Sequence, residues 1–396
     1  MKEIPVLCKN KKECCGCTAC YSVCPVKAIS MEPDEEGFLY PSIDPEKCVQ
    51  CYQCLTVCDY KKEKLKVKKL DEGENSGFLS QPLIYGGRLK DRTALQDSTS
   101  GGAFTALSDI FLSDGNGIVC SSYNYDSHKQ QFHLITDKRD RDNARGTKYV
   151  QSDPGDVFTE AEQWLKSNPE KKLLFFGVGC QAAGFKSFME MKRLSDRIVI
   201  VDIICHGSPS PEIWQKYIKN VEEKNGKIEY INLRDKRKGW NRSIAVAKIG
   251  SKEVSLQNYR RLYSARLNYR LSCHECPYTT IDRSTDITIG DFWRIEKNHP
   301  DQYDKLGTSL IIIHTQKGLD LFDRAKPCLD YFESDSKKCL QPNLERPSAI
   351  SSDREKYWKD YSTFGIDYVI GKYGKKSLIN KVNKIIKKIL SVMKSK

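Results

Sequence analysis

The feature of this sequence that most constrains its fold is a cysteine pattern that occurs twice near the N-terminus. Both copies have the spacing C-x2-C-x2-C-x3-C, and each cysteine of the second copy lies 34 residues after its counterpart. Two-residue gaps let one short loop direct three thiolates at a single iron–sulfur cubane, while the fourth thiolate lies on the next helical turn and reaches the other cubane. We therefore expect two sets of ligands: group 1 is Cys14, Cys17, Cys20 and Cys58, and group 2 is Cys48, Cys51, Cys54 and Cys24.

A zinc site is the alternative for clustered cysteines, but zinc uses paired C-x2-C motifs and four ligands in all. Two triplets plus two single cysteines fit the bacterial ferredoxin pattern instead. Pro25 follows Cys24 as that pattern expects. Asp59 replaces the proline after Cys58 and alters the surroundings of the second copy of the cysteine pattern. Residues 35–41 predict a turn into a short strand. The segment resembles a two-cluster ferredoxin, which implies an α+β ferredoxin-like domain over residues 1–65 with two 4Fe-4S clusters.

Most of the 17 cysteines are clustered, which favours metal binding in a reducing compartment over disulfide bonds. No apolar run approaches the roughly 18 residues of a membrane-spanning helix, and the first residues lack an apolar signal region. We therefore expect a cytoplasmic protein. Five cysteines receive no role and are interpreted as small buried or free thiols: Cys8, Cys15, Cys120, Cys328 and Cys339.

The formal net charge of +13 is concentrated in two segments. Residues 61–69 hold six lysines and one glutamate, and residues 371–396 hold nine lysines and no acid, so the rest of the chain carries −1. Nucleic-acid binding is therefore excluded, because neither basic segment interleaves lysines with base-stacking aromatics.

The middle of the chain alternates apolar, strand-like runs with amphipathic helical stretches, which predicts an α/β domain. A polar linker at 66–80 precedes this domain, which we place at 81–340 with an N-terminal part at 81–160 and a C-terminal part at 161–340. We expect a helix at 103–112, strands at 173–176 and 197–205, and a helix that Ser210 caps and Pro211 begins.

Two single cysteines and one pair give this domain a possible site of its own. Cys180 and Cys205 follow the two expected strands, where open α/β sheets bind ligands. Cys273 and Cys276 form a C-x2-C pair. Spacing alone leaves three interpretations: a third metal site built from these four cysteines (group 3), two buried thiols beside a chance pair, or a redox-active pair.

A Ser/Gly turn at 98–102 precedes the helix expected at 103–112, and its backbone N–H groups suit either a bound phosphate or an ordinary helix cap. The glycines at 177 and 179 do not form the dinucleotide-binding fingerprint, because the third glycine is misplaced. No phosphate-binding Walker loop is present.

Six motifs in order resemble the beta subunit of coenzyme F420 hydrogenase/dehydrogenase, a family of iron–sulfur flavoproteins. They lie at residues 100–107, 146–152, 177–181, 205–210, 273–277 and 283–293. The resemblance implies bound FAD and a third 4Fe-4S cluster with the group 3 cysteines as ligands. It also implies an FAD pocket among Ser100, Gly101, Gly102, Lys148, Tyr149, Gln181 and Asp291. Lys148 is either a phosphate or flavin contact or a surface lysine, and Arg283, Asp286 and Asp291 either line the pocket or pair with each other.

The resemblance implies an oxidoreductase that passes electrons between 4Fe-4S clusters and FAD to a small acceptor, with a redox donor or acceptor protein as partner. Relatives act on a deazaflavin coenzyme, on electrons from formate or hydrogen, or on a chlorophyll derivative. Members fused to a ferredoxin resemble proteins encoded in bacterial surface-polysaccharide regions. The acceptor and the direction of electron flow stay open. The alternative is an electron-transfer or assembly partner that keeps the ferredoxin clusters and has no flavin catalysis.

The last segment, residues 341–396, is predicted to be a basic helical tail. Apolar residues between 378 and 393 recur at helical spacing, with lysines largely on the other faces. Such a helix suits an anionic membrane surface, the body of the protein or a partner.

Overall fold

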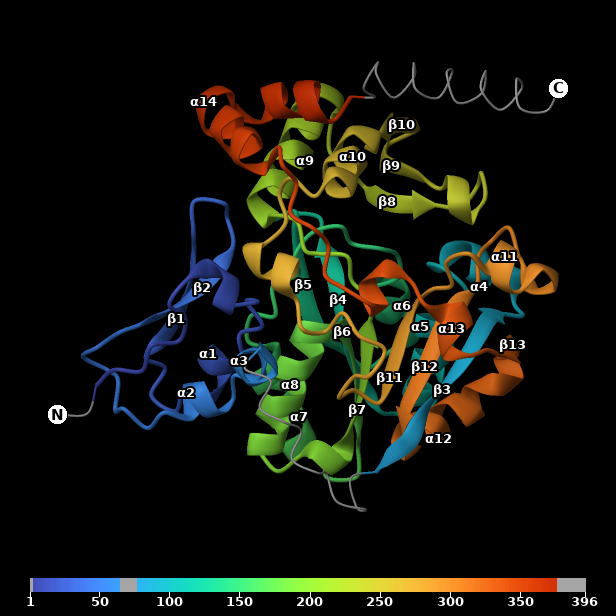
Figure 1. Ribbon diagram of the computed structural model, residues 1–396, viewed down its shortest axis with the longest axis horizontal. Helices are drawn as coiled ribbons and strands as arrows, with labels where there is room; N and C mark the ends of the chain where they lie inside the picture. The colour runs from blue at the N-terminus through green and yellow to red at the C-terminus, as the bar shows by residue number, and fades with distance from the viewer. Residues whose placement is uncertain (1–2, 65–76, 376–396) are drawn as a thin grey trace.

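The computed structural model describes residues 3–64 and 77–375, in which a small N-terminal domain lies beside a larger α/β body (Figure 1). The helix expected at 378–393 and most of the linker expected at 66–80 lie outside these residues. One boundary of that linker is corrected: strand β3 begins at Phe78. The reason is that Phe78 pairs with Thr315 of a neighbouring strand, so residues 78–80 belong to the sheet of the body.

The backbone conformation of the N-terminal domain repeats with the same 34-residue spacing as the cysteines. Gly16 and Gln50 have φ angles of 71° and 56°, and Thr18 and Tyr52 have 63° and 61°. The two residues of each pair are 34 positions apart. These left-handed conformations turn the chain sharply between neighbouring cysteines, and Thr18, Gln50 and Tyr52 adopt them at a cost in backbone strain.

The domain has α+β architecture, as expected. A two-stranded antiparallel sheet is joined by a turn in which Gly37 has a φ of 78°. This turn and the strand after it confirm the expectation for residues 35–41. The elements are β1 (Ile29–Pro33), β2 (Leu39–Ile43), α1 (Ala19–Val23), α2 (Gln53–Thr56) and α3 (Asp59–Lys64).

The body is built on one eight-stranded sheet with the order β13-β3-β12-β11-β7-β6-β4-β5. The central strands β11, β7, β6 and β4 run parallel, and the flanking pairs are antiparallel. Both parts expected for the body, 81–160 and 161–340, contribute strands to this sheet. The strands are β3 (Phe78–Leu89), β4 (Gly117–Asn124), β5 (Lys129–Ile135), β6 (Leu173–Val178), β7 (Ile198–Ile203), β11 (Ile287–Asp291), β12 (Ser309–Thr315) and β13 (Leu329–Glu333).

Helices cover both faces of this sheet and bury its alternating apolar side chains. Leu107 and Phe322 belong to the core on one face, and Phe158 and Phe185 pack against Phe175 on the other. The helix expected at 103–112 is confirmed. The helices are α5 (Ala103–Ser113) and α12 (Gln316–Ala325) on the first face, and α7 (Val157–Ser167) and α8 (Gly179–Met191) on the second.

A second unit of the body lies beyond the carboxyl ends of β6 and β7, at the top of Figure 1. It contains a three-stranded sheet and three helices around the buried Trp214 and Tyr259. Ser210 accepts a 3.2 Å hydrogen bond from the N–H of Ile213, which confirms the expected helix cap. The elements are α9 (Pro211–Asn225), β8 (Tyr230–Asp235), β9 (Ile244–Ile249), β10 (Lys252–Ser255), α10 (Gln257–Ala265) and α14 (Arg354–Tyr373).

Shorter helices complete the body: α4 (Arg92–Asp97), α6 (Lys138–Asn143), α11 (Ile295–Asn298) and α13 (Ser336–Cys339). Within residues 3–64 and 77–375, every helix is too short or too polar to cross a membrane.

The N-terminal domain packs on α7 and α8 through an apolar interface. Ala19, Val23 and Val57 are buried in the same core as Phe185 and Phe188. The two domains therefore share a core, which fixes the cysteine loops against the body.

Candidate functional site

The structure brings the four group 1 cysteines together at the interface with the body. The pKa of the Cys20 thiol is raised well above its usual value by burial and by the neighbouring Cys17, Cys14 and Cys58 thiols. The backbone N–H of Gly16 points at the Sγ of Cys14, 3.4 Å away. The fourth cysteine of the second repeat therefore lies with the first three of the first repeat, as the spacing predicts.

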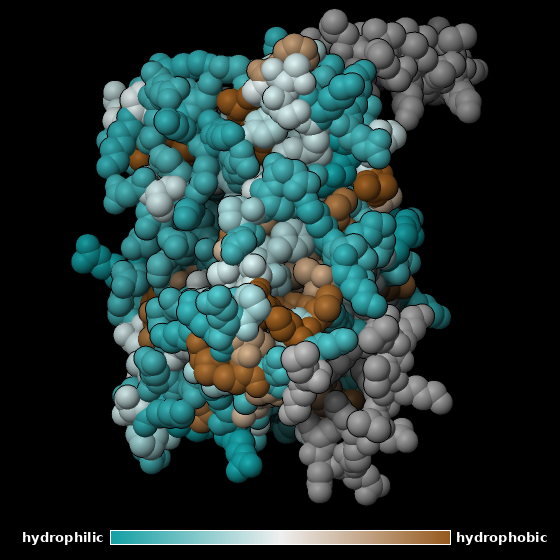
Figure 2. All heavy atoms as spheres, turned by 90° about the vertical axis from the view of Figure 1, so that its left-hand side faces the viewer, coloured by the Kyte–Doolittle hydropathy of each residue, from teal (hydrophilic) through white to brown (hydrophobic). Residues whose placement is uncertain are grey.

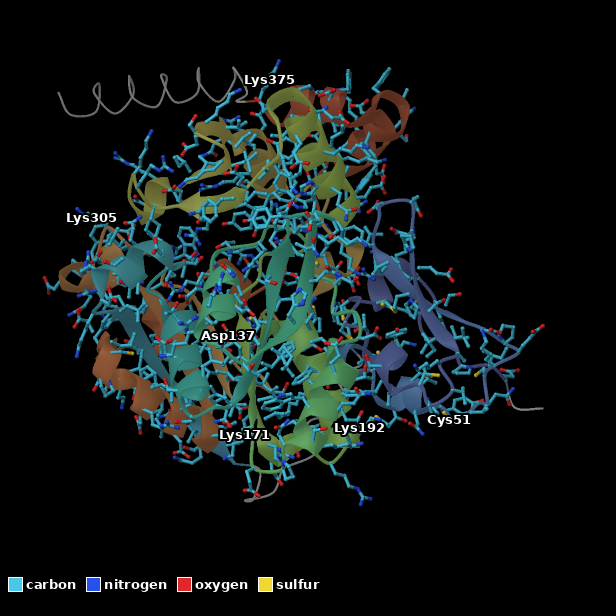
Figure 3. All side chains as sticks on the ribbon, turned by 180° about the vertical axis from the view of Figure 1, so that it is seen from behind. Cys51, Asp137, Lys171, Lys192, Lys305 and Lys375 are labelled. Carbon is cyan, nitrogen blue, oxygen red and sulfur yellow. The ribbon has the colours of Figure 1, made fainter. Side chains whose placement is uncertain are left out.

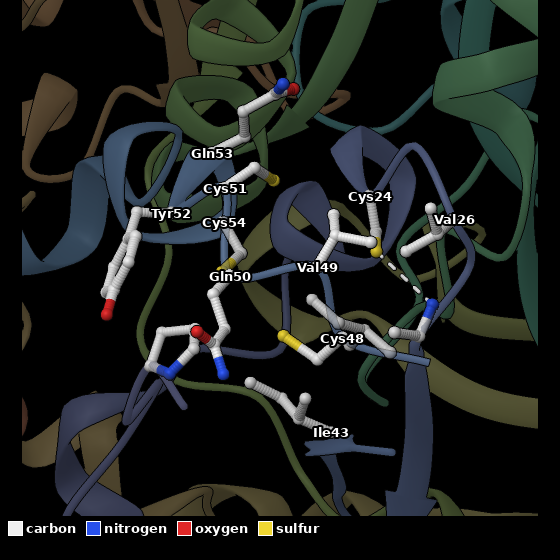
Figure 4. A pocket seen from close by; sticks show the side chains of 13 residues that line it. Cys24, Val26, Ile43, Cys48, Val49, Gln50, Cys51, Tyr52, Gln53 and Cys54 are labelled. Carbon is white, nitrogen blue, oxygen red and sulfur yellow. Dashed lines mark hydrogen bonds between the residues drawn. The ribbon is translucent and has the colours of Figure 1, made fainter. Parts of the chain in front are cut away.

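The group 2 cysteines line a single pocket at the outer end of the N-terminal domain (Figure 4). Cys24 of the first repeat joins Cys48, Cys51 and Cys54 of the second there. The N–H of Ala28 donates a 3.3 Å hydrogen bond to the Sγ of Cys24. Cys51 is exposed and lies at the lower rim of the N-terminal domain (Figure 3).

The group 3 cysteines also converge, although they come from three separate loops. Cys180 follows β6, Cys205 follows β7, and Cys273 and Cys276 lie in and directly after a short 3-10 helix, η4 (Leu271–Glu275). The Cys180 thiol has Cys276, Cys273 and Cys205 as its ionisable neighbours. The backbone N–H of Ser208 donates to the Sγ of Cys273 over 3.3 Å, and the N–H of Gly207 donates to that of Cys205 over 3.3 Å.

The chemistry of these donor sets fits iron–sulfur clusters. Burial raises the pKa of the Cys205 thiol to about 12 and that of Cys273 to about 11, so the thiols need a metal's positive charge to become thiolates. In the described ranges no three His, Cys, Asp or Glu side chains are placed to share one metal ion. A 4Fe-4S cubane takes four thiolate ligands, the number that each group supplies.

Cys15 connects group 1 to group 3, a role that the sequence did not reveal. Cys15 is 5% exposed, and both Cys17 and Cys180 pack against the apolar cluster that contains it. Tyr60 and Tyr278 enclose it in a small apolar cluster. The expectation of a buried thiol is confirmed. Its contact with the body involves Cys180, which lies 165 positions later in the sequence.

The turn at Ser100 packs against the sheet and points at the end of β11. The hydroxyl of Ser100 donates a 2.8 Å hydrogen bond to the carbonyl of Thr308, and the N–H of Gly101 donates to Ser309 Oγ over 2.9 Å. A Cβ on Gly101 would lie 2.1 Å from the carbonyl oxygen of Gly87, so the close approach requires glycine. Gly102 has a φ of 81° and begins α5.

Asp291 lies at the carboxyl end of β11, beside the Ser100 turn, and polar and aromatic side chains surround it. Burial raises the pKa of Asp291, but the charge of Arg234 and hydrogen bonds from Arg234 and Trp240 outweigh burial and hold it below its usual value. The Nε1 of Trp240 donates to Asp291 over 3.1 Å. Arg234 also contacts Tyr149, whose ring stacks on Tyr263 with centroids 4.0 Å apart.

Two buried oxygens beside this group, Thr308 Oγ1 and Gln341 Oε1, lack a hydrogen-bond partner within the part of the chain that is described. The amide nitrogen of Gln341 donates to the backbone carbonyl of Asp291 over 3.3 Å. Burying such acceptors without a donor is costly, so the site fits a ligand that brings hydrogen-bond donors.

Lys148 and Gln181 have partners outside this group. The ammonium of Lys148 donates to the backbone carbonyls of Ala144 and Arg145, and burial lowers its pKa to about 8. Gln181 donates to the carbonyl of Ser152 over 2.8 Å. The structure therefore brings Ser100, Tyr149 and Asp291 together and gives Lys148 and Gln181 separate contacts.

Arg283, Asp286 and Asp291 do not pair with each other. Arg283 forms an ion pair with the buried Asp202, and Asp286 accepts a 2.6 Å hydrogen bond from the hydroxyl of Thr315. Asp291 pairs with Arg234, which lies outside every motif that the sequence offered.

Comparisons with known proteins find matches to two families and to several relatives. Residues 13–62 match the family "4Fe-4S dicluster domain", and residues 170–334 match the family described as the C terminus of the beta subunit of coenzyme F420 hydrogenase/dehydrogenase. The chain is 23% identical to one of the subunits of the F(420)H(2) dehydrogenase of Methanosarcina mazei over 341 residues, which is 81% of this chain and 84% of that protein.

Two further similarities cover different parts of the chain. An uncharacterised ferredoxin of Methanocaldococcus jannaschii is 36% identical over 69 residues, which is 17% of this chain and 88% of the ferredoxin. A chain of the F420-reducing NiFe hydrogenase complex from Methanosarcina barkeri has a TM-score of 0.44 and 17% identity, covering 72% of this chain and 94% of that one.

Proposed function

Because residues 170–334 match the C-terminal part of the beta subunits of coenzyme F420 hydrogenase/dehydrogenase and residues 13–62 match a 4Fe-4S dicluster domain, we propose that the chain is an iron–sulfur flavoprotein oxidoreductase of this family. In this proposal groups 1, 2 and 3 each hold one 4Fe-4S cluster, and FAD binds beside Asp291. When bound, the clusters would carry single electrons and the flavin would exchange two electrons with a small acceptor.

The observation that carries this proposal is the packing of Cys15, Cys17 and Cys180 in one apolar cluster at the interface between the two domains. This packing places the loop that carries the group 1 residue Cys17 directly against the loop of the body that carries the group 3 residue Cys180. Group 2 lies next to group 1, since Cys54 and Cys24 share an apolar core with Cys20 of group 1. The chain thus supplies a row of thiol groups across both domains.

The row continues from group 3 toward the proposed flavin position. The ring of Tyr263 contacts those of Tyr149 and Tyr269, and Cys205 is another of its ionisable neighbours, so this aromatic ring lies between a group 3 cysteine and the Asp291 group. Tyr149, Ser100 and Asp291 are the residues we propose to contact FAD. Lys148 and Gln181 support the surrounding loops through their carbonyl contacts, and Gly101 and Gly102 let the Ser100 turn approach the sheet.

We propose that a redox partner protein docks at the group 2 end. Ile4, Val6, Val26 and Val49 of this domain are between 39% and 60% exposed, and Figure 2 shows apolar side chains on this face. Exposed apolar patches of this kind mark interaction sites. The relative from Methanosarcina mazei is by its name one of the subunits of a dehydrogenase and so part of an assembly, which supports a protein partner here.

The experiment that tests the proposal is an anaerobic visible spectrum of the purified chain with chemical extraction of flavin. We expect iron–sulfur absorption that bleaches on reduction and about one FAD per chain, since family members bind a single flavin. Intact clusters without flavin after gentle anaerobic purification would contradict the flavoprotein proposal and favour an electron-transfer or assembly partner.

A further inference from the structure

Arg270 is a buried cation without a carboxylate partner. Four arginines in the described part of the chain are buried: Arg141, Arg270, Arg283 and Arg354. Three of them form ion pairs with aspartate or glutamate, whereas Arg270, at 1% exposure, forms none in the same part of the chain. An isolated buried charge is strongly disfavoured, so an anion that is not a carboxylate is expected next to it.

The guanidinium of Arg270 is held on the group 1 loop. Its Nε donates to the carbonyl of Cys14 over 2.8 Å, and its Nη2 donates to the carbonyl of Leu39 over 2.9 Å. The centroid of the Tyr40 ring lies 4.1 Å from the guanidinium carbon. A Cβ on Gly16 would be 2.9 Å from Nη1, so the charge sits directly against the backbone between two group 1 cysteines.

The backbone of the same residue is held on the group 3 loops. The N–H of Arg270 donates to the carbonyl of Ser208 over 3.0 Å, and its carbonyl accepts from the N–H of Cys273 over 3.0 Å. Cys14, Cys15 and Cys273 are all ionisable neighbours of the guanidinium. One residue therefore places a fixed positive charge between the two groups.

We infer that Arg270 is the shared counter-ion of the clusters in groups 1 and 3 and raises the reduction potentials of both. This inference rests on the proposed function, since it requires both clusters. A cubane held by four thiolates is anionic, and its reduction adds one electron and therefore one further negative charge. A nearby fixed cation stabilises the more negative state, so it favours the reduced cluster.

The test is a redox titration of the full chain, purified anaerobically with its clusters and followed by electron paramagnetic resonance. Each cluster takes one electron from the reductant. We expect Arg270→Gln to lower the midpoint potentials of the group 1 and group 3 clusters and to leave that of the group 2 cluster unchanged. Arg270→Lys keeps the charge and should stay near the wild-type values.

Gln151 supplies the matched control. It accepts a 3.2 Å hydrogen bond from Arg270 Nη1 and donates a 2.9 Å hydrogen bond to the carbonyl of Cys15, so Gln151→Leu breaks the same interface without changing any charge. Its potentials should match the wild type. Gln151→Glu places a carboxylate against the guanidinium and should lower the reduction potentials of the group 1 and group 3 clusters. This variant tests the inference if Arg270→Gln loses its clusters and cannot be titrated.

Unchanged group 1 and group 3 potentials in Arg270→Gln with full iron content would overturn the inference, as would equal shifts in Gln151→Leu. If Arg270→Gln loses its clusters, unchanged potentials in Gln151→Glu would overturn it as well. Failure of the proposed function is a different result, because the wild-type chain itself would then lack iron in group 1 or group 3.

Discussion

Gly184 on α8 packs directly against the side chain of Cys17. A Cβ built on Gly184 would lie 2.8 Å from the Sγ of Cys17 and 2.9 Å from its Cβ, distances that real side chains do not reach. Gly184 follows Cys180 by four residues and therefore shares its helix face. The absence of a side chain at this position brings the helix that carries a group 3 cysteine into contact with the group 1 loop.

Gly184→Ala tests this close approach. We expect the added methyl to force the two domains apart and to reduce the free energy of unfolding by about 1–3 kcal/mol, the usual cost of overpacking. Chemical denaturation of the anaerobic protein measures it. Gly371→Ala in α14 is the control, since nothing lies within 4 Å of its added Cβ. Equal stability of Gly184→Ala and wild type would show that the interface adapts without cost.

Cys14 and Cys15 are adjacent in sequence but are predicted to differ in function. Cys14→Ser should remove a group 1 ligand and lose up to about four iron atoms per chain, the content of one cubane. Cys15→Ser should keep the full iron content, because Cys15 packs beside Cys17 and Cys180 and lies outside the ligand spacing. Iron analysis of both variants measures this. Iron loss in Cys15→Ser equal to that in Cys14→Ser would mean that Cys15 is itself a ligand.

His314 is predicted to make stability depend on pH. Burial lowers its pKa to about 4 from 6.5, and its Nε2 is 2.9 Å from the hydroxyl of Thr288. Between these two pKa values the unfolded chain binds a proton that the folded chain does not, so stability rises with pH. His314 alone should make the wild type about 1 kcal/mol less stable at pH 5.5 than at pH 7.

His314→Gln should lack this part of the pH dependence, and His133→Gln, at an exposed position, should keep it. Denaturation curves at the two pH values compare the three proteins. A His314→Gln variant with the same pH dependence as wild type would contradict the assignment.

The sequence was sufficient to predict features that depend on local spacing. The 34-residue repeat specified which cysteines join across the two halves, because each loop turns at equivalent positions such as Thr18 and Tyr52. Apolar periodicity likewise located α5, and the Ser210–Pro211 pair located the start of α9.

Contacts between distant segments were not predictable in the same way. Arg270 reaches the carbonyl of Cys14 across 256 residues, and Arg234 reaches Asp291 across 57. Neither arginine lies in a sequence motif. The contacts of each could be recognised only from the structure, in which the sheet and the domain interface determine where the guanidinium lies. The partners of Lys148 and Gln181 were hidden for the same reason.

The iron content of the wild-type chain and of the Cys273→Ser/Cys276→Ser double variant tests the central claim most directly. Three 4Fe-4S clusters give about twelve iron atoms per chain for the wild type and about eight for the variant, whose group 3 has lost two ligands. Both proteins must be purified anaerobically, and the flavin content is measured on the same samples. About eight iron atoms in both would contradict a cluster in group 3.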